Sequence, residues 1–227
     1  MYGVIILKEN ELKPEIVDQA TGEPAVSRRK RKNSAASGAK TLLLYLHDFV
    51  YLLGIILVVL LVCFRIVVVS GPSMRQTLLD GDSLLLLTRT FYRTPQQGDI
   101  VVISKASYDN GEPIVKRVIA TENQWVDIDF TEGVVYVGDK KDQLKALDEP
   151  YVNTPTNLFE GISFPCQVPE GCVFVMGDNR NESKDSRSPE IGMIDTREVL
   201  GKAIFLFFPG TDGGRSERDF GRIGGLD

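Results

Sequence analysis

The sequence predicts a mainly-β domain, an antiparallel sheet of sandwich or barrel type, preceded by one transmembrane α-helix. Two observations carry this prediction. Residues 42–64 form an almost unbroken apolar run, and from about residue 66 onward short β-branched segments follow one another, separated by Gly, Pro, Asp and Asn. Little helical periodicity accompanies these segments, so the pattern favours an all-β architecture without deciding between sandwich and barrel.

The apolar run at residues 42–64 predicts the transmembrane helix. Only His47 and Asp48 interrupt it, both near its start. A helix rises about 1.5 Å per residue, so this run can cross a hydrocarbon core of roughly 30 Å. A buried soluble helix is usually shorter and apolar on one face, and a cleaved signal peptide does not follow about forty polar residues. We therefore expect a retained membrane span.

Basic residues flank this run on one side only. Arg and Lys fill positions 28–32 and Lys40 follows, whereas Arg65 stands nearly alone after the run. The positive-inside rule then places the N-terminus in the cytoplasm and the following domain outside, in a single-pass protein of the cell membrane. Residues 1–41 have no sustained apolar period, so we expect a basic cytoplasmic tail that is mostly disordered.

The remainder of the chain carries the strand signals. Residues 65–209 form the predicted extracytoplasmic domain, in which residues 139–170 contain four prolines and no regular pattern. The Gly-rich residues 210–227 are expected to form a flexible tail. Eight short segments predict strands, at residues 66–69, 83–87, 99–104, 114–120, 125–130, 134–137, 173–176 and 203–208.

Composition excludes several classes of function. From residue 65 onward, 18 Lys or Arg stand against 25 Asp or Glu, a net charge of −7, so we expect no nucleic-acid binding. The sequence has no P-loop and no dinucleotide-binding glycine motif, and we expect no cofactor and no metal. A disulfide between Cys166 and Cys172 is allowed outside the cytoplasm, but so short a loop needs particular geometry. The bonded and the free forms therefore both stay open.

The single histidine, His47, lies within the apolar run. A Ser-His-Asp triad or a multi-histidine zinc site in the outer domain is therefore excluded. A hydrolase built on this sequence must use Ser, Thr, Lys or carboxylates. Two dense polar segments offer such groups: residues 70–78, where a Gly-Pro pair makes a stiff approach to Ser73, and residues 176–188. Each of them, taken alone, is also compatible with an ordinary loop or turn.

A serine nucleophile without a histidine needs a lysine as its base. To accept a proton near neutral pH, a lysine must lower its pKa by about three units from roughly 10.4, which burial in an apolar setting can do. Lys116 lies on an alternating strand with Ile114 and Val118, and Lys202 precedes an apolar segment. An edge lysine that keeps its ammonium group in solvent is the alternative for either. The pattern alone does not separate the two.

Together these segments resemble the type I signal peptidases, the Ser/Lys endopeptidases of family S26 that remove signal peptides from exported proteins. The resemblance extends from the apolar run to about Pro209, includes GDNRNESKDSR at residues 177–187, and implies a large antiparallel β fold. Gly71, two residues before the serine, is typical of many Gram-positive members. The other matching motifs lie at residues 70–78, 98–102, 115–119 and 201–203.

The resemblance assigns roles by position. Ser73 would be the nucleophile and Lys116 the general base, which selects this lysine over the other candidate. Ser183 would hydrogen-bond and orient the lysine, while Asp185 and Arg187 would form a structural ion pair that holds their segment against the site. Some members have a serine hydroxyl in the oxyanion hole where this chain has glycine. The backbone N–H of Ser73 is therefore the expected donor.

The resemblance also implies the substrates and partners. These are signal peptides of secreted pre-proteins, cut after small-x-small sequences next to the lipid bilayer and near the protein-export machinery. Shallow apolar pockets would exclude larger side chains. Six residues are expected to line them: Val67, Val69, Met74, Leu78, Leu84 and Val115.

Two positions depart from the family pattern. Gln76 stands where the motif usually has proline, and Ala120 where it usually has glycine. Neither departure removes a catalytic group, so we expect altered turns and retained activity. One alternative is another Ser/Lys peptidase, which the membrane span disfavours. The other is a catalytically silent membrane scaffold or binding homologue, which the presence of both Ser73 and Lys116 disfavours.

Overall fold

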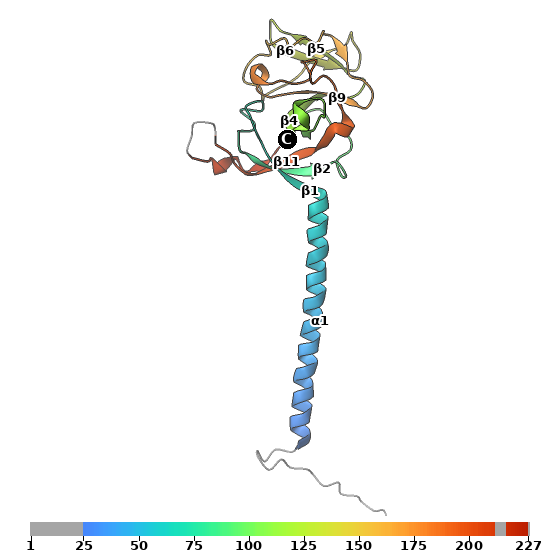
Figure 1. Ribbon diagram of the computed structural model, residues 1–227, viewed down its shortest axis with the longest axis vertical. Helices are drawn as coiled ribbons and strands as arrows, with labels where there is room; N and C mark the ends of the chain where they lie inside the picture. The colour runs from blue at the N-terminus through green and yellow to red at the C-terminus, as the bar shows by residue number, and fades with distance from the viewer. Residues whose placement is uncertain (1–24, 212–216, 227) are drawn as a thin grey trace, which may run out of the picture. The chain divides into compact units, whose positions relative to one another are not determined.

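The computed structural model of the chain describes residues 25–211 and 217–226. The chain divides into two units, Met1–Val58 and Val59–Asp227. The first unit holds most of a long α-helix, and the strands lie in the second unit (Figure 1).

Helix α1 spans Ala25–Cys63. Within it, Lys40–Cys63 is the one stretch of the described residues that is long and apolar enough to cross a membrane. The large apolar side chains of residues 42–62 are exposed. The helix begins before the predicted span because a nucleated helix extends at low cost into residues such as Ala, Lys and Arg. Residues 25–41 of the predicted disordered tail are thus helical, and residues 1–24 lie outside the described part.

The described residues contain twelve strands, and each of the eight predicted segments coincides with one of them. The strands are β1 Phe64–Val68, β2 Ser83–Thr88, β3 Ile100–Ile103, β4 Ile114–Ala120, β5 Trp125–Asp129, β6 Val134–Gly138, β7 Lys145–Ala146, β8 Cys166–Gln167, β9 Cys172–Met176, β10 Ile194–Asp195, β11 Val199–Phe208 and β12 Gly224–Gly225. Short 3-10 helices lie at η1 Asp109–Gly111, η2 Arg180–Glu182, η3 Thr196–Glu198 and η4 Phe220–Arg222.

The strands form two antiparallel sheets. The larger sheet has the order β1-β2-β11-β3-β4-β9-β10, and β12 pairs with β11. The smaller sheet has the order β7-β6-β5-β8. Figure 1 shows β5 and β6 at one end of this unit and β1, β2 and β11 at the other, with β4 and β9 between them. The predicted mainly-β antiparallel domain is confirmed.

Strand β4 lies at the centre of the core. It pairs with β3 on one side and with β9 on the other. Three apolar clusters form the core, and β4 contributes Val115 to the first, Ile119 to the second and Val118 to the third. Burying a side chain of this size stabilises the fold by about 1.5–3 kcal/mol. A polar side chain on this strand is therefore held in a rigid and largely dry environment.

Some local features differ from the prediction. Strands β7, β8, β10 and β12 were not expected, because a two-residue pairing depends on the neighbouring strand and not on local propensity. Residues 217–226 of the predicted flexible tail contain η4 and β12, and their order comes from contacts with β11 that a Gly-rich composition does not reveal. Cys166 and Cys172 are free thiols, so the disulfide that the spacing allowed is not formed.

Candidate active site

Ser73 lies in the turn that leaves β1. Gly71 has a φ of +88°, a left-handed value that glycine adopts without a steric cost, and its N–H donates to Asp80 Oδ1 at 2.9 Å. The turn then closes through the Leu78 N–H, which donates to the Met74 carbonyl at 2.8 Å. Because Met74 is buried in the first apolar cluster, it anchors the turn and leaves Ser73 half-buried at its start.

Lys116 lies in the middle of β4 and its side chain contacts Ser73. Its side chain is 3% exposed, and its Nζ lies 2.7 Å from Ser73 Oγ. Burial lowers the pKa of Lys116 from 10.5 to about 8, because a charged ammonium loses its hydration in the protein interior. The negative charges of Asp185 and Glu160 oppose this shift in part. The result is an amine that can be neutral near physiological pH, in contact with a hydroxyl.

Lys202, the other candidate base, has a different partner. It lies on β11, and its Nζ pairs with Asp99 Oδ1 at 2.6 Å. Tyr92 donates its hydroxyl to the other oxygen of the same carboxylate. The Lys202 amine is therefore held at Asp99 and not at Ser73 Oγ, so this lysine is not placed to act as the base.

The segment after β9 holds the Ser73 turn in place. The Asn179 backbone N–H donates to the Ser73 carbonyl at 3.0 Å, and its side chain donates to the Pro72 carbonyl at 3.1 Å. Thr77 donates its hydroxyl to Asp178 Oδ2 at 2.6 Å. Gly177 allows this close approach, because a Cβ at that position would lie 2.4 Å from the Ser73 carbonyl oxygen.

A buried ion pair connects this segment to β4. Arg117 binds Asp178 with two hydrogen bonds, from Nε at 2.9 Å and from Nη2 at 2.8 Å. It also donates to the Gly98 carbonyl and stacks on the ring of Tyr151 at 3.9 Å. Since Arg117 directly follows Lys116, the two halves of the site are fixed to each other through neighbouring residues.

Asp185 and Arg187 form a second buried pair. Arg187 donates Nε to Asp185 Oδ1 and Nη2 to Oδ2, both at 2.8 Å, and Asp185 also accepts from the Gly177 N–H at 3.0 Å. Further donors of Arg187 reach the carbonyls of Arg180 and Leu158. The pair therefore closes the loop after β9 on itself and positions Gly177 beside the Ser73 turn.

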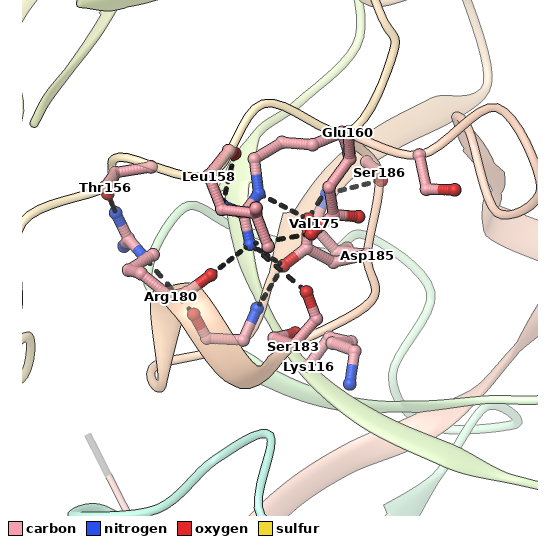
Figure 2. Close-up of polar contacts among 12 residues, drawn as sticks. Lys116, Thr156, Leu158, Glu160, Val175, Arg180, Ser183, Asp185 and Ser186 are labelled. Atoms are coloured by element: carbon pink, nitrogen blue, oxygen red, sulfur yellow. Dashed lines mark hydrogen bonds and ion pairs between the residues drawn. The ribbon is translucent and has the colours of Figure 1, made fainter. Parts of the chain in front are cut away.

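Ser183 differs from what the resemblance implies. It is buried in the region of Lys116 and Asp185 (Figure 2), but its Oγ has no hydrogen-bond partner. The structure therefore shows no hydrogen bond between Ser183 and Lys116, whereas Lys116 Nζ is within hydrogen-bond distance of Ser73 Oγ. Few buried polar side chains in folded proteins lack a hydrogen-bond partner.

Comparison with known proteins identifies the family. The chain matches the family described as "Signal peptidase, peptidase S26" over residues 42–208. The chain belongs to this family. The "Probable signal peptidase I-1" of Synechocystis sp. is 35% identical over 155 residues, which cover 65% of this chain and 72% of that protein. The signal peptidase I of Bacillus licheniformis is 34% identical over 154 residues, which cover 64% and 77%.

A crystal structure of a signal peptidase I from Enterococcus faecalis V583 is also similar. It shares 27% sequence identity, covers 49% of this chain and 97% of that chain, and has a TM-score of 0.38. The family match and the relatives confirm the resemblance found in the sequence. The chain is a serine endopeptidase of the signal peptidase I type.

The six residues expected to line the substrate pockets lie together in the first apolar cluster. Leu78 and Leu84 are fully buried, so they have no surface left for a substrate and would act as the floor beneath one. Val67 is half-buried and is the most accessible of the set. The other members are Val69, Met74 and Val115.

The two departures from the S26 pattern have visible local consequences. Gln76 has a φ of 89°, a left-handed value that the ring of proline excludes, so this turn differs from one that a proline would form. Ala120 is fully buried in the second cluster at a bulge in the pairing of β4 with β9. Neither residue is among the hydrogen-bond partners of Ser73 or Lys116.

Sequence reasoning missed four residues that hold the site: Thr77, Arg117, Asp178 and Asn179. All four lie within the motifs on which the family resemblance rests, so the sequence did identify the segments that form the site. The sequence does not show which partners these four residues bind, because their hydrogen bonds depend on the approach of the loop after β9 to the Ser73 turn.

Proposed function

We propose that the chain removes N-terminal signal peptides from exported pre-proteins, with Ser73 as the nucleophile and Lys116 as the general base. The observation that carries this proposal is the 2.7 Å contact between Ser73 Oγ and the buried Lys116 Nζ. A base must lie within hydrogen-bond reach of the proton that it takes, and its pKa must lie near the working pH. The distance and the lowered pKa of Lys116 support this assignment.

The reaction is an acyl transfer. Neutral Lys116 takes the proton of Ser73 Oγ, which attacks the scissile carbonyl carbon and forms a tetrahedral oxyanion. The backbone N–H of Ser73 is the donor that we propose for this oxyanion. When the scissile C–N bond breaks, Lys116 returns the proton to the leaving amine. It then takes a proton from the water that attacks the carbonyl carbon of the acyl-enzyme, and returns it to Ser73 Oγ when the ester bond to Ser73 breaks.

The surrounding residues support this pair. We assign Asp185 and Arg187 to fixing the loop after β9, and the unpartnered hydroxyl of Ser183 is available to orient Lys116. The apolar cluster beneath the site, with Val67 nearest to the surface, suits small side chains at the first and third positions before the cut. Residues with small side chains at these two positions are the mark of a signal-peptide cleavage site.

The membrane assignment rests on the helix and its flanks. Lys40–Cys63 would anchor the enzyme, with the basic residues 28–32 in the cytoplasm and the β domain outside. The expected partners are therefore the lipid bilayer, signal peptides that lie in it, and the export machinery that delivers them.

Cleavage of a pre-protein by the purified full-length chain in detergent tests the proposal. Mass spectrometry should identify a mature N-terminus directly after a small-x-small site, and a large residue at the first or third position before the cut should prevent cleavage. Ser73→Ala should abolish cleavage, whereas Ser70→Ala, an exposed serine of the same turn, should not. Cleavage by Ser73→Ala at the normal rate would reject the nucleophile. A wild type that never cleaves would favour the silent scaffold.

The pH dependence of cleavage follows from Lys116. Only its neutral form can take the proton of Ser73, and the pKa of Lys116 is lowered to about 8. We therefore expect kcat/KM to increase about tenfold per pH unit below that value and to level off above it. The measurement is kcat/KM for a peptide substrate without titrating side chains, from about pH 6 to about pH 10. A flat profile, or one that falls with increasing pH, would contradict Lys116 as the base.

A further inference from the structure

A buried carboxylate lies at the far end of the turn that carries Ser73. Asp82 has no exposed surface. Its Oδ2 accepts from the Leu79 N–H at 2.7 Å and from Arg222 Nη2 at 2.7 Å. Its Oδ1 accepts from the Gly210 N–H at 2.6 Å and from Arg222 Nη1 at 2.9 Å. Arg222 is the cation that compensates this charge, so its removal would leave a carboxylate buried without one.

Two of these three partners lie beyond the part of the chain that matches the S26 family, which ends at residue 208. Gly210 packs directly on the turn, since a Cβ at this position would lie 2.1 Å from the Asp80 carbonyl oxygen. Arg222 belongs to η4, on the other side of residues 212–216. Two separate points of the C-terminal segment thus converge on one carboxylate of the Ser73 turn.

Arg222 also contacts this turn directly. Its Nη2 donates to the Thr77 carbonyl at 3.2 Å. The hydroxyl of Thr77 donates to Asp178, which is paired with Arg117 next to Lys116. The turn is therefore held on one side by the loop after β9 and on the other side by Arg222.

The C-terminal segment has its own attachments to the sheet. Strand β12 pairs with β11, and the Leu226 N–H donates to the Ile204 carbonyl at 3.1 Å. The Leu226 side chain packs against the apolar cluster that contains Met74 and Leu78. Arg222 is thus carried by a segment that is fixed to the same core as the Ser73 turn.

We propose that Arg222 is a positioning residue of this peptidase. By neutralising Asp82 and binding the Thr77 carbonyl, it fixes the turn that holds Ser73 Oγ at 2.7 Å from Lys116 Nζ. This inference rests on the proposed function, with Ser73 as the nucleophile. A displacement of a reacting group by about 1 Å can reduce a rate by up to about a hundredfold, so the loss of this contact is expected to act on kcat.

Kinetics of Arg222 variants test the consequence for catalysis. Arg222→Ala should reduce kcat by about tenfold or more with KM changed less than about threefold, because substrate contacts remain. Arg222→Lys, which keeps the charge but not the two-pronged geometry, should recover part of the loss. The matched control is Arg218→Ala in the same segment, where the arginine stacks on Phe208 and donates to the Pro209 carbonyl. This control should keep the wild-type kcat.

Hydrogen–deuterium exchange tests the contact itself, independently of activity. In Arg222→Ala the amides of residues 77–79 should exchange faster, while those of β5 and β6 should not change. Unchanged exchange at residues 77–79, or a loss confined to KM, would overturn the proposal. If the wild type does not cleave, the proposed function is wrong, and so is the role of Arg222 in catalysis, even where amide exchange at residues 77–79 increases in Arg222→Ala. If Ser73→Ala is dead and Arg222→Ala has normal kcat, only the role of Arg222 fails.

Discussion

Replacing Lys116 with methionine should reduce kcat/KM for signal-peptide cleavage by more than about a thousandfold. Methionine has a similar length and fills the same buried space, but it has no amine to take the proton of Ser73. Without a base the serine hydroxyl is a weak nucleophile at neutral pH. The measurement is kcat/KM of the purified full-length variant on the same pre-protein as the wild type.

Lys202→Met is the control for this variant. Lys202 is the other lysine that the sequence pattern allowed, and it pairs with Asp99 away from Ser73. We expect this variant to retain most of the activity, because Lys202 Nζ binds Asp99 and takes no part in the contact between Ser73 Oγ and Lys116 Nζ. If Lys202→Met is inactive and Lys116→Met is active, the base is Lys202 and not Lys116.

The loss in Lys116→Met should not come from unfolding. The pKa of Lys116 is about 8 in the fold and 10.5 without its environment, so burial disfavours the protonated form. Below about pH 8 both states carry the proton, and the cost of burying the charge is present in full. Between about pH 8 and 10.5 only the unfolded state holds it, so wild-type stability rises with pH in this window. At pH 7 the methionine variant should be at least as stable as the wild type.

Local sequence pattern was sufficient for most of the fold. The β-branched segment at 134–137 is a strand in the structure because alternation and propensity agree with its burial. The segment at 114–120 is also a strand, but its burial does not alternate, because residues 115–120 are all buried. Strand β11 begins at Val199 and not at 203 as predicted. There Gly201 allows close contact with β2, since a Cβ would lie 2.1 Å from the Leu87 carbonyl oxygen. Glycine has a low strand propensity, so the local pattern disfavours a strand at Gly201, although close packing against β2 requires a glycine there.

The candidate site was predictable only in part. The sequence reduced the base to Lys116 and Lys202, which look alike in pattern, and the family resemblance was needed to choose between them. Their difference is the partner that each one meets in three dimensions, Ser73 Oγ or Asp99. Arg222 has no local signal at all, because it lies in a Gly-rich tail and its partner Asp82 is distant in the sequence.

Replacing Arg187 with methionine should lower the free energy of unfolding by about 3–5 kcal/mol. Arg187 and Asp185 are both fully buried, and the guanidinium also satisfies the carbonyls of Arg180 and Leu158. The variant leaves the Asp185 carboxylate without its cation inside the protein, where water cannot compensate it. Chemical denaturation of the full chain in detergent, followed by fluorescence of the single tryptophan, Trp125, measures the change.

The chain contains a matched control for this experiment, since Asp195 and Arg197 repeat the same Asp-x-Arg spacing at the surface. Arg197 binds Asp195 through Nε and Nη2, as Arg187 binds Asp185, but the Arg197 side chain is 78% exposed. Arg197→Met should therefore leave stability almost unchanged, because solvent screens the pair. Equal losses in the two variants would show that the Asp-x-Arg turn, and not burial, gives the pair its importance.

In the folded fraction of Arg187→Met, the loss of a nearby positive charge raises the pKa of Lys116. The profile of activity against pH should therefore move to higher pH.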